Sequence, residues 1–192
     1  MCRKILHFTF MNSISKSSPC TSRHQQTLRQ EENAFTLIEL LIVITIIVIL
    51  ASVAFVALDP LTRFRNARDA NRAAAISQIL SSVKIDQVDN GGNYLTAITN
   101  MTAGNVYMIG TATAGCDDNN ASCDTAVSND TACVDLTGLV TEGYLGTVPF
   151  SPAGAVTWVA ATTGYTLQRA STGILTVRSC ESENTTEIKT SR

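Results

Sequence analysis

The longest apolar stretch of the chain runs from Phe35 to Leu58, and Glu39 is its only charged residue. At about 1.5 Å of rise per residue, a helix of this length crosses the ~30 Å hydrocarbon core of a bilayer. The pattern therefore predicts a transmembrane helix. A charge inside such a helix costs at least a few kcal/mol unless something pairs with it, so Glu39 is a candidate functional residue.

A plain signal anchor or an uncleaved export signal would also contain an apolar run of this kind. An ordinary secretory signal, however, has an apolar core of about 7 to 15 residues that is followed by a small-residue cleavage site. Here the run is longer, and no A-x-A-like site follows it before Asp59 and Pro60. The basic residues lie before the run, in a polar segment that ends abruptly at Ala34.

The pattern becomes amphipathic after Leu58, which indicates that the helix continues to about Val88. Apolar residues recur along one face at intervals of three and four: Ile76, Ile79, Leu80 and Val83. The breaker cluster at residues 89–92 should end the helix. Pro60 lacks a backbone donor and should kink or loosen the turn before it. The whole helix would have about fifty residues and measure about 80 Å.

Basic residues occupy the other faces of this amphipathic half: Arg63, Arg65, Arg68 and Arg72. The simplest interpretation is a solvated face beside the lipid headgroups. The alternative is contact with acidic patches of neighbouring subunits. Arg65 and Asp69 have the i, i+4 spacing of an intrahelical ion pair.

Short β-rich runs bounded by turn residues follow Tyr94. They span residues 106–109, 156–159, 165–169 and 174–178. We expect the last three to form an antiparallel meander, and a short helical turn within residues 136–145. A helix followed by strands predicts an α+β fold. Its long N-terminal helix, membrane-spanning in the first half and amphipathic in the second, would pack residues Ile76 to Val83 on a small C-terminal antiparallel sheet.

Charge divides the chain at Ala34. Residues 1–34 hold five Lys/Arg and two Asp/Glu, a net charge of +3, whereas residues 35–192 hold nine and fourteen, a net charge of −5. Basic residues before a membrane span favour the cytoplasmic side, so the C-terminal part should lie outside the cytoplasm. Its acidity argues against direct nucleic-acid binding. We divide the chain into an unstructured leader that is removed (1–34, starting at Met1 or Met11), a transmembrane helix (35–58), an amphipathic continuation (59–90) and a β domain (91–192).

Two of the six cysteines lie in the leader, and four belong to the exported part: Cys116, Cys123, Cys133 and Cys180. An even number in an exported domain indicates disulfides, and four cysteines allow three pairings. We favour Cys116 with Cys123, which closes a polar loop, and Cys133 with Cys180, which ties down the last strand. A metal-thiolate site is the competing interpretation. It lacks C-x-x-C spacing, and both histidines of the chain lie in the leader.

The segment from Ala34 to Leu40, followed by the apolar run, closely resembles the processing motif of type IV prepilins and type II secretion pseudopilins. The resemblance implies that a prepilin peptidase cuts between Ala34 and Phe35 and N-methylates Phe35. Two residues depart from the family pattern. Ala34 stands where Gly is usual, and Asn33 stands where Lys or Arg is usual. Ala34 is still small, so we expect cutting, at a slower rate.

The resemblance also implies a partner for Glu39, which would be the fifth residue of the mature chain. In the family, this carboxylate is kept for assembly and pairs with the N-terminal amine of a neighbouring subunit, here that of Phe35. Pairing would neutralise a buried charge and set the axial register of a filament.

The polar loop between residues 111 and 131 is a candidate calcium-binding site. Hard oxygen donors lie close together there: Asp117, Asp118, Asn119 and Asp124. Some major pseudopilins bind calcium in a loop near this point. The spacing is not that of an EF-hand, however, and solvated turn residues are the simpler interpretation.

The sequence argues against an enzyme. The part after the leader has no histidine for a Ser-His-Asp or Cys-His arrangement, and no Gly-rich phosphate loop. Its carboxylates have no distinctive spacing and are expected to be surface charges: Asp135, Glu142, Glu181 and Glu183.

We therefore expect a single-pass membrane protein that polymerises into a pilus-like filament, at the cell surface or in the periplasm. Its partners would be other pilin-like subunits, the prepilin peptidase, a membrane assembly platform and lipid. The alternative is a membrane-anchored binding module that never polymerises. Glu39 argues against that alternative, because an anchor that stays in lipid gains nothing from a carboxylate.

Overall fold

The computed structural model describes residues 35–192. The predicted leader, residues 1–34, lies outside the described residues. The described part of the chain divides into two units, which meet between residues 47 and 48. Helix α1 (Leu37–Leu58) begins in the first unit and ends in the second, which also holds helix α2 (Pro60–Asp89) and every strand of the described residues.

The long helix is interrupted at one residue, Asp59, which has φ 36° and ψ 69°. This left-handed conformation is uncommon for a residue other than glycine. Pro60 is the first residue of α2, where its missing N–H costs nothing because the first helical donors have no partner within the helix. The break therefore lies directly before the proline, as predicted. Helix α2 ends at Asp89, where Gly91 and Gly92 adopt positive φ.

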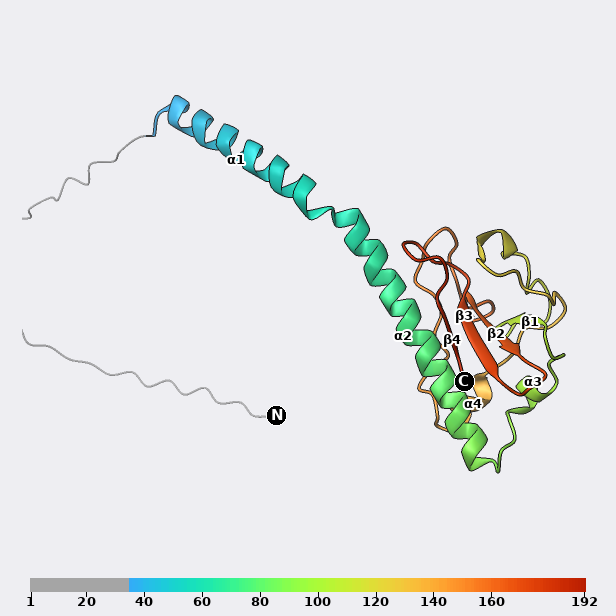
Figure 1. Cartoon of the computed structure of the whole chain (residues 1–192). Coiled ribbons are helices and arrows are strands. Elements are labelled where there is room, and N and C mark those ends of the chain that lie inside the picture. Colours follow the sequence, from blue (N-terminus) through green and yellow to red (C-terminus); the bar gives the residue numbers. More distant parts are fainter. Residues whose placement is uncertain (1–34) are drawn as a thin grey trace, which may run out of the picture. The chain divides into compact units, whose positions relative to one another are not determined.

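A four-stranded antiparallel sheet lies beside α2 (Figure 1). Its strands run in chain order: β1 (Val106–Met108), β2 (Tyr165–Arg169), β3 (Leu175–Ser179) and β4 (Lys189–Ser191). Strands β2 and β3 form a hairpin in which Leu167 lies opposite Val177. The α+β fold predicted from the sequence is confirmed.

Two details of the predicted sheet are wrong. Residues 156–159 do not form a strand and make only an isolated bridge between Val159 and Thr162. Trp158 is instead buried in a second apolar cluster with Met108 and Cys180. The outer position beside β3 belongs to β4, whose polar sequence Lys-Thr-Ser gave no strand signal.

The main core lies between α2 and the sheet. The helical stripe Ile76, Ile79, Leu80 and Val83 is buried with residues of the sheet: Leu167, Leu175 and Val177. Two short helices add Ile98, from α3 (Thr96–Thr99), and Leu139, from α4 (Thr137–Thr141). A 3-10 turn, η1 (Asn120–Ser122), lies in the polar loop. The predicted contact of the helical stripe with the sheet is confirmed, as is the short helix within residues 136–145.

Candidate functional site

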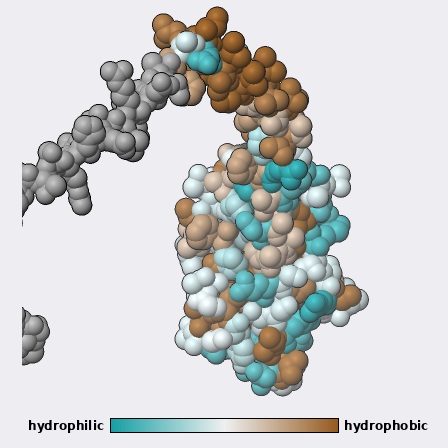
Figure 2. Space-filling view, turned by 90° about the vertical axis from the view of Figure 1, so that its left-hand side faces the viewer, coloured by the Kyte–Doolittle hydropathy of each residue, from teal (hydrophilic) through white to brown (hydrophobic). Residues whose placement is uncertain are grey.

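Helix α1 is apolar on all of its faces, and none of its residues is buried. Its large hydrophobic side chains are between 48% and 89% exposed, and Figure 2 shows them as a brown surface. Twenty-two residues at about 1.5 Å each give about 33 Å, enough to cross a bilayer. A helix that is apolar all round is stable in lipid or among other helices, but not in water. The helix is thus long and apolar enough to anchor the chain in a membrane.

The one carboxylate of this helix, Glu39, caps the helix N-terminus. Its Oε2 accepts hydrogen bonds from the backbone N–H of Thr36, at 2.9 Å, and from the Thr36 hydroxyl, at 3.0 Å. In return the backbone N–H of Glu39 donates to the Thr36 hydroxyl, at 3.2 Å. This reciprocal pair is a capping box, in which two otherwise unpaired helix donors are satisfied.

The capping box has a sequence signature, Thr-x-x-Glu before an apolar run, which the sequence analysis missed. Within residues 35–192, no donor reaches the other carboxylate oxygen, Oε1. Glu39 is exposed, so this oxygen can bind a group from outside the chain.

Comparison with known protein families decides what this segment is. Residues 29–55 match the family model described as the prokaryotic N-terminal methylation motif. The chain carries a prepilin-type methylation motif. This motif is the hallmark of type IV pilins and pseudopilins, so the resemblance drawn from Ala34 to Leu40 is confirmed. No curated protein and no solved structure matches the chain.

The motif supports a type IV pilin-like protein, a family that is structural rather than enzymatic. In general it implies processing by a prepilin peptidase and a pilin-like polymer, and together with α1 it fits membrane anchoring. Cleavage itself stays a prediction. Asn33 and Ala34 lie outside the described residues, and Phe35 is exposed just before α1.

The arginines of α2 divide into two pairs. Arg63 and Arg65 are exposed, as the interpretation of a solvated face predicts. That interpretation is wrong for Arg72, which is fully buried. Arg68 is partly buried and binds Glu183 with two of its nitrogens.

Arg72 is the centre of a network that ties α2 to the connection between β3 and β4. Its guanidinium binds Asp69 at 2.9 Å, Glu183 at 2.8 Å and Glu181 at 2.9 Å. It also donates to the hydroxyl of Ser151 and to the carbonyl of Pro152. Asp69 is therefore paired with Arg72, three residues away, and not with Arg65 as its spacing suggested.

Two of the predicted surface carboxylates belong to this network. Glu181 is only 7% exposed, and its Oε1 also accepts the backbone N–H of Val156 at 3.0 Å. Hydrogen bonds from Arg68 and then Arg72 lower the pKa of Glu183 to about 2, despite an opposing contribution from burial. Glu181 and Glu183 lie more than a hundred residues from Arg72 along the chain, so no local spacing could have indicated these contacts.

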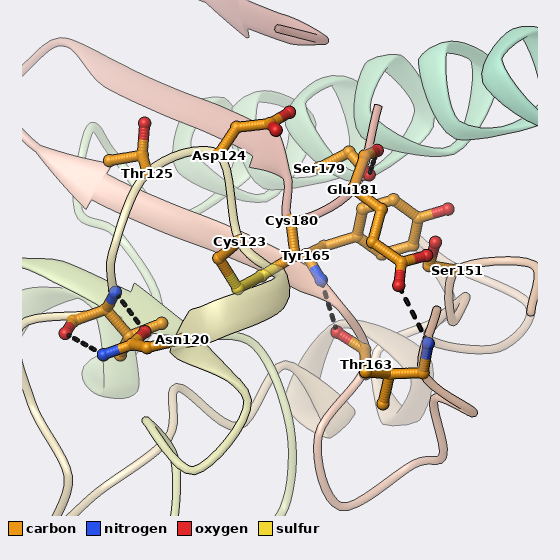
Figure 3. Close-up of a disulfide and its surroundings, with 12 residues drawn as sticks. Asn120, Cys123, Asp124, Thr125, Ser151, Thr163, Tyr165, Ser179, Cys180 and Glu181 are labelled. Atoms are coloured by element: carbon orange, nitrogen blue, oxygen red, sulfur yellow. Dashed lines mark hydrogen bonds between the residues drawn. A yellow bond between two sulfur atoms is a disulfide. The ribbon is translucent and has the colours of Figure 1, made fainter. Parts of the chain in front are cut away.

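The four cysteines form two disulfides, but the predicted pairing is wrong. Cys116 is bonded to Cys133. Cys123 is bonded to Cys180, and Figure 3 shows this second disulfide. Backbone hydrogen bonds explain the pairing. The N–H of Asp124 donates to the carbonyl of Cys180 at 2.7 Å, which brings the polar loop to the end of β3. Cys123 therefore meets the distant Cys180 and not its neighbour in the sequence.

The residues predicted to bind calcium do not all lie together. Asp117 and Asp118 are grouped with Asp130, and their nearest ligand atoms lie within 4.8 Å of one another. The carboxyl group of Asp130 raises the pKa of Asp117 through a direct contact. Asp124 faces a different group, since it accepts a hydrogen bond from Ser182 at 2.6 Å. Calcium binding by this loop, including by Asn119, stays a prediction.

Proposed function

We propose that the chain is a structural subunit of a type IV pilus-like filament, either a pilin or a pseudopilin of a secretion or DNA-uptake machine. It would be inserted in the membrane, cleaved and N-methylated at Phe35, and then polymerised through α1. One observation carries the proposal: a helix that is apolar on all faces, overlaps the methylation motif as far as residue 55 and presents a single carboxylate in its first turn.

The physical argument concerns what replaces lipid around α1. An apolar helix can leave the membrane without a large cost in free energy only if other apolar helices cover it, since otherwise its apolar side chains would be exposed to water on all faces. Packing of α1 against copies of itself, or against the helices of related subunits, meets this requirement. The amphipathic α2 would then place the folded domain on the outside of the filament.

Glu39 would supply the specificity that apolar packing lacks. Its Oε2 is held by Thr36, so the carboxylate has a fixed direction, and its Oε1 is left to bind a neighbour. Cleavage before Phe35 would create a positively charged amine, and N-methylation keeps that charge. An ion pair between this amine and Glu39 of the next subunit would neutralise two charges that are costly when buried alone.

The partners of the proposed subunit would be a prepilin peptidase, a membrane assembly platform, other pilin-like subunits and lipid. Its folded domain would lie outside the cytoplasm. The competing function is a membrane-anchored binding module that does not polymerise. Such a module has no use for a charge that makes the anchor a poorer membrane span.

The deciding experiment compares Glu39→Ala and Glu39→Gln with the wild type at equal membrane abundance. The assay is recovery of sheared filaments, supported by crosslinking of neighbouring subunits. We expect Glu39→Ala to insert and to be cleaved but not to assemble, and Glu39→Gln to be intermediate because it keeps a hydrogen-bond acceptor. Ser52→Ala is the matched control, since it removes a neutral polar group from the same helix and should assemble normally.

Unchanged assembly of Glu39→Ala would remove the carboxylate from the mechanism and favour the anchored module. Mass spectrometry of the mature N-terminus tests the preceding step independently. We expect a chain that begins at methylated Phe35, and an intact leader in cells with an active prepilin peptidase would contradict the proposed processing.

A further inference from the structure

A polar groove lies where the end of α2 meets the end of α4. Its volume is about 310 Å³. Its lining carries mostly oxygen-bearing side chains: Asp86, Asn90, Asn93, Tyr94, Thr96 and Glu142. The groove belongs to the folded domain, far along the chain from the methylation motif, and the proposed function gives it no role.

Asp86 lines this groove and is fully buried. One of its oxygens, Oδ1, accepts a hydrogen bond from the side chain of Asn90 at 2.6 Å. The other, Oδ2, is buried and has no hydrogen-bond partner among the described residues. An unpaired oxygen on a buried carboxylate loses its hydration without compensation, so such atoms are rare unless a ligand completes them.

A second carboxyl group faces the first. Glu142 directly follows α4, lines the same groove and has its carboxyl group in contact with that of Asp86. Two acidic groups in contact repel each other unless a proton or a cation lies between them.

The part of the chain that the structure describes supplies no such cation. Among residues 35–192, no Lys or Arg forms an ion pair with Asp86, Asp89 or Glu142. Lys84 is nearby in the sequence, but its ammonium donates to Gln87 at 3.1 Å and to the hydroxyl of Tyr94 at 2.6 Å. Helix α2 also has no basic residue in its last turn, where the helix dipole is negative and favours a cation.

We infer that this groove binds a divalent cation of the calcium type, held by Oδ2 of Asp86 and the carboxylate of Glu142. The donor set is the reason for this choice of ion. Calcium takes six to eight oxygen ligands in a flexible arrangement, and Asn93 and Thr96 line the same groove with further oxygen donors. The groove offers no imidazole or thiolate among its lining residues, which would favour zinc.

A bound ion would connect two separate elements of the domain. Asp86 belongs to the last turn of α2, and Glu142 ends α4, fifty-six positions further along the chain. The ion would hold α4 against the helix end and remove the repulsion between the two carboxylates. Calcium should therefore stabilise the folded domain, and this does not depend on filament assembly.

The test uses the full chain in detergent micelles after removal of metals with a chelator. Calcium chloride is titrated by calorimetry, and thermal unfolding is followed with and without the ion. The site variants are Asp86→Asn and Glu142→Gln. The matched control is the double variant Asp117→Asn with Asp118→Asn, which removes two of the three carboxylates that cluster in the polar loop.

We expect both site variants to bind calcium at least about tenfold more weakly, since loss of even an outer partner of a metal ligand costs that much. The rise in melting temperature with calcium should disappear in them and persist in the control. Glu142 is exposed, so Glu142→Gln decides the matter if Asp86→Asn does not fold.

Three results would overturn the inference. The first is that the wild type binds no calcium, which would mean that a proton alone holds the two carboxyl groups together. The second is that Glu142→Gln binds calcium as tightly as the wild type, which would mean that the ion lies elsewhere. The third is that only the control variant, with Asp117 and Asp118 replaced, loses calcium binding, which would mean that the polar loop is the site.

Discussion

Replacement of Arg72 tests the buried ion network most directly. All five N–H groups of its guanidinium have acceptors, namely three carboxylates, the hydroxyl of Ser151 and the carbonyl of Pro152. Arg72→Met keeps a side chain of similar length but leaves Asp69 and Glu181 as buried carboxylates without a cation. Breaking a buried pair by removal of one partner costs about 3 to 5 kcal/mol in the free energy of unfolding.

This loss of stability can be measured in the full chain. Trp158 is the only tryptophan and is 2% exposed, so its fluorescence reports unfolding of the β domain and not the state of α1. For a domain of this size, each kcal/mol lowers the melting temperature by about 2 to 4 °C. We therefore expect Arg72→Met to melt about 6 to 20 °C below the wild type.

The matched control is Arg65→Met, on an exposed face of the same helix. It should change the free energy of unfolding by no more than about 0.5 kcal/mol. A loss below about 1 kcal/mol in Arg72→Met would refute the reasoning, because it would mean that the carboxylates are hydrated or protonated without their arginine.

Three further predictions concern the same domain. Since the pKa of Glu183 is lowered from 4.5 to about 2 in the folded state, its contribution to stability should be present above pH 4.5 and be lost between about pH 4.5 and 2. Acid titrations of unfolding should therefore show a smaller loss of stability over that range in Glu183→Gln than in the wild type. Gly164→Ala should destabilise the domain strongly, because the added Cβ would lie 2.5 Å from the buried indole of Trp158. Gly173→Ala also lies at positive φ but has open space around it, so it carries only the backbone strain, and a comparison of the two melting temperatures tests this difference. Peptide mapping without reduction should recover Cys123 joined to Cys180, and any other partner for Cys123 would contradict the docking of the polar loop on β3.

Much of the fold could be predicted from local patterns. The apolar run and the three- and four-residue spacing of Ile76 to Val83 are periodic, so they specified a long helix and the face that enters the core. The position of the helix break was also predictable, because the restriction imposed by Pro60 depends only on covalent structure. The hairpin of β2 and β3 followed from β-rich runs separated by a turn at Ser171 to Gly173.

Most of the errors concern partners that are distant in the sequence. Residues 156–159 have strand-like composition, but burial of Trp158 in the second apolar cluster prevailed over β propensity. Strand β4 has a polar sequence and exists because β3 offers it a free edge. The disulfide pairing depended on which strand end the polar loop reaches, which no spacing of cysteines records.

The candidate site shows the same division. By itself, the sequence determined the methylation motif, the apolar helix and the place of Glu39, because these features are contiguous and a membrane span is specified by length and hydrophobicity alone. Only the tertiary structure decided that Arg72 is buried among Asp69, Glu181 and Glu183, and that Asp86 and Glu142 face each other. Folding brings together groups from separate segments, and the cost of burying their charges, which decides how they pair, arises only once the surrounding core excludes water.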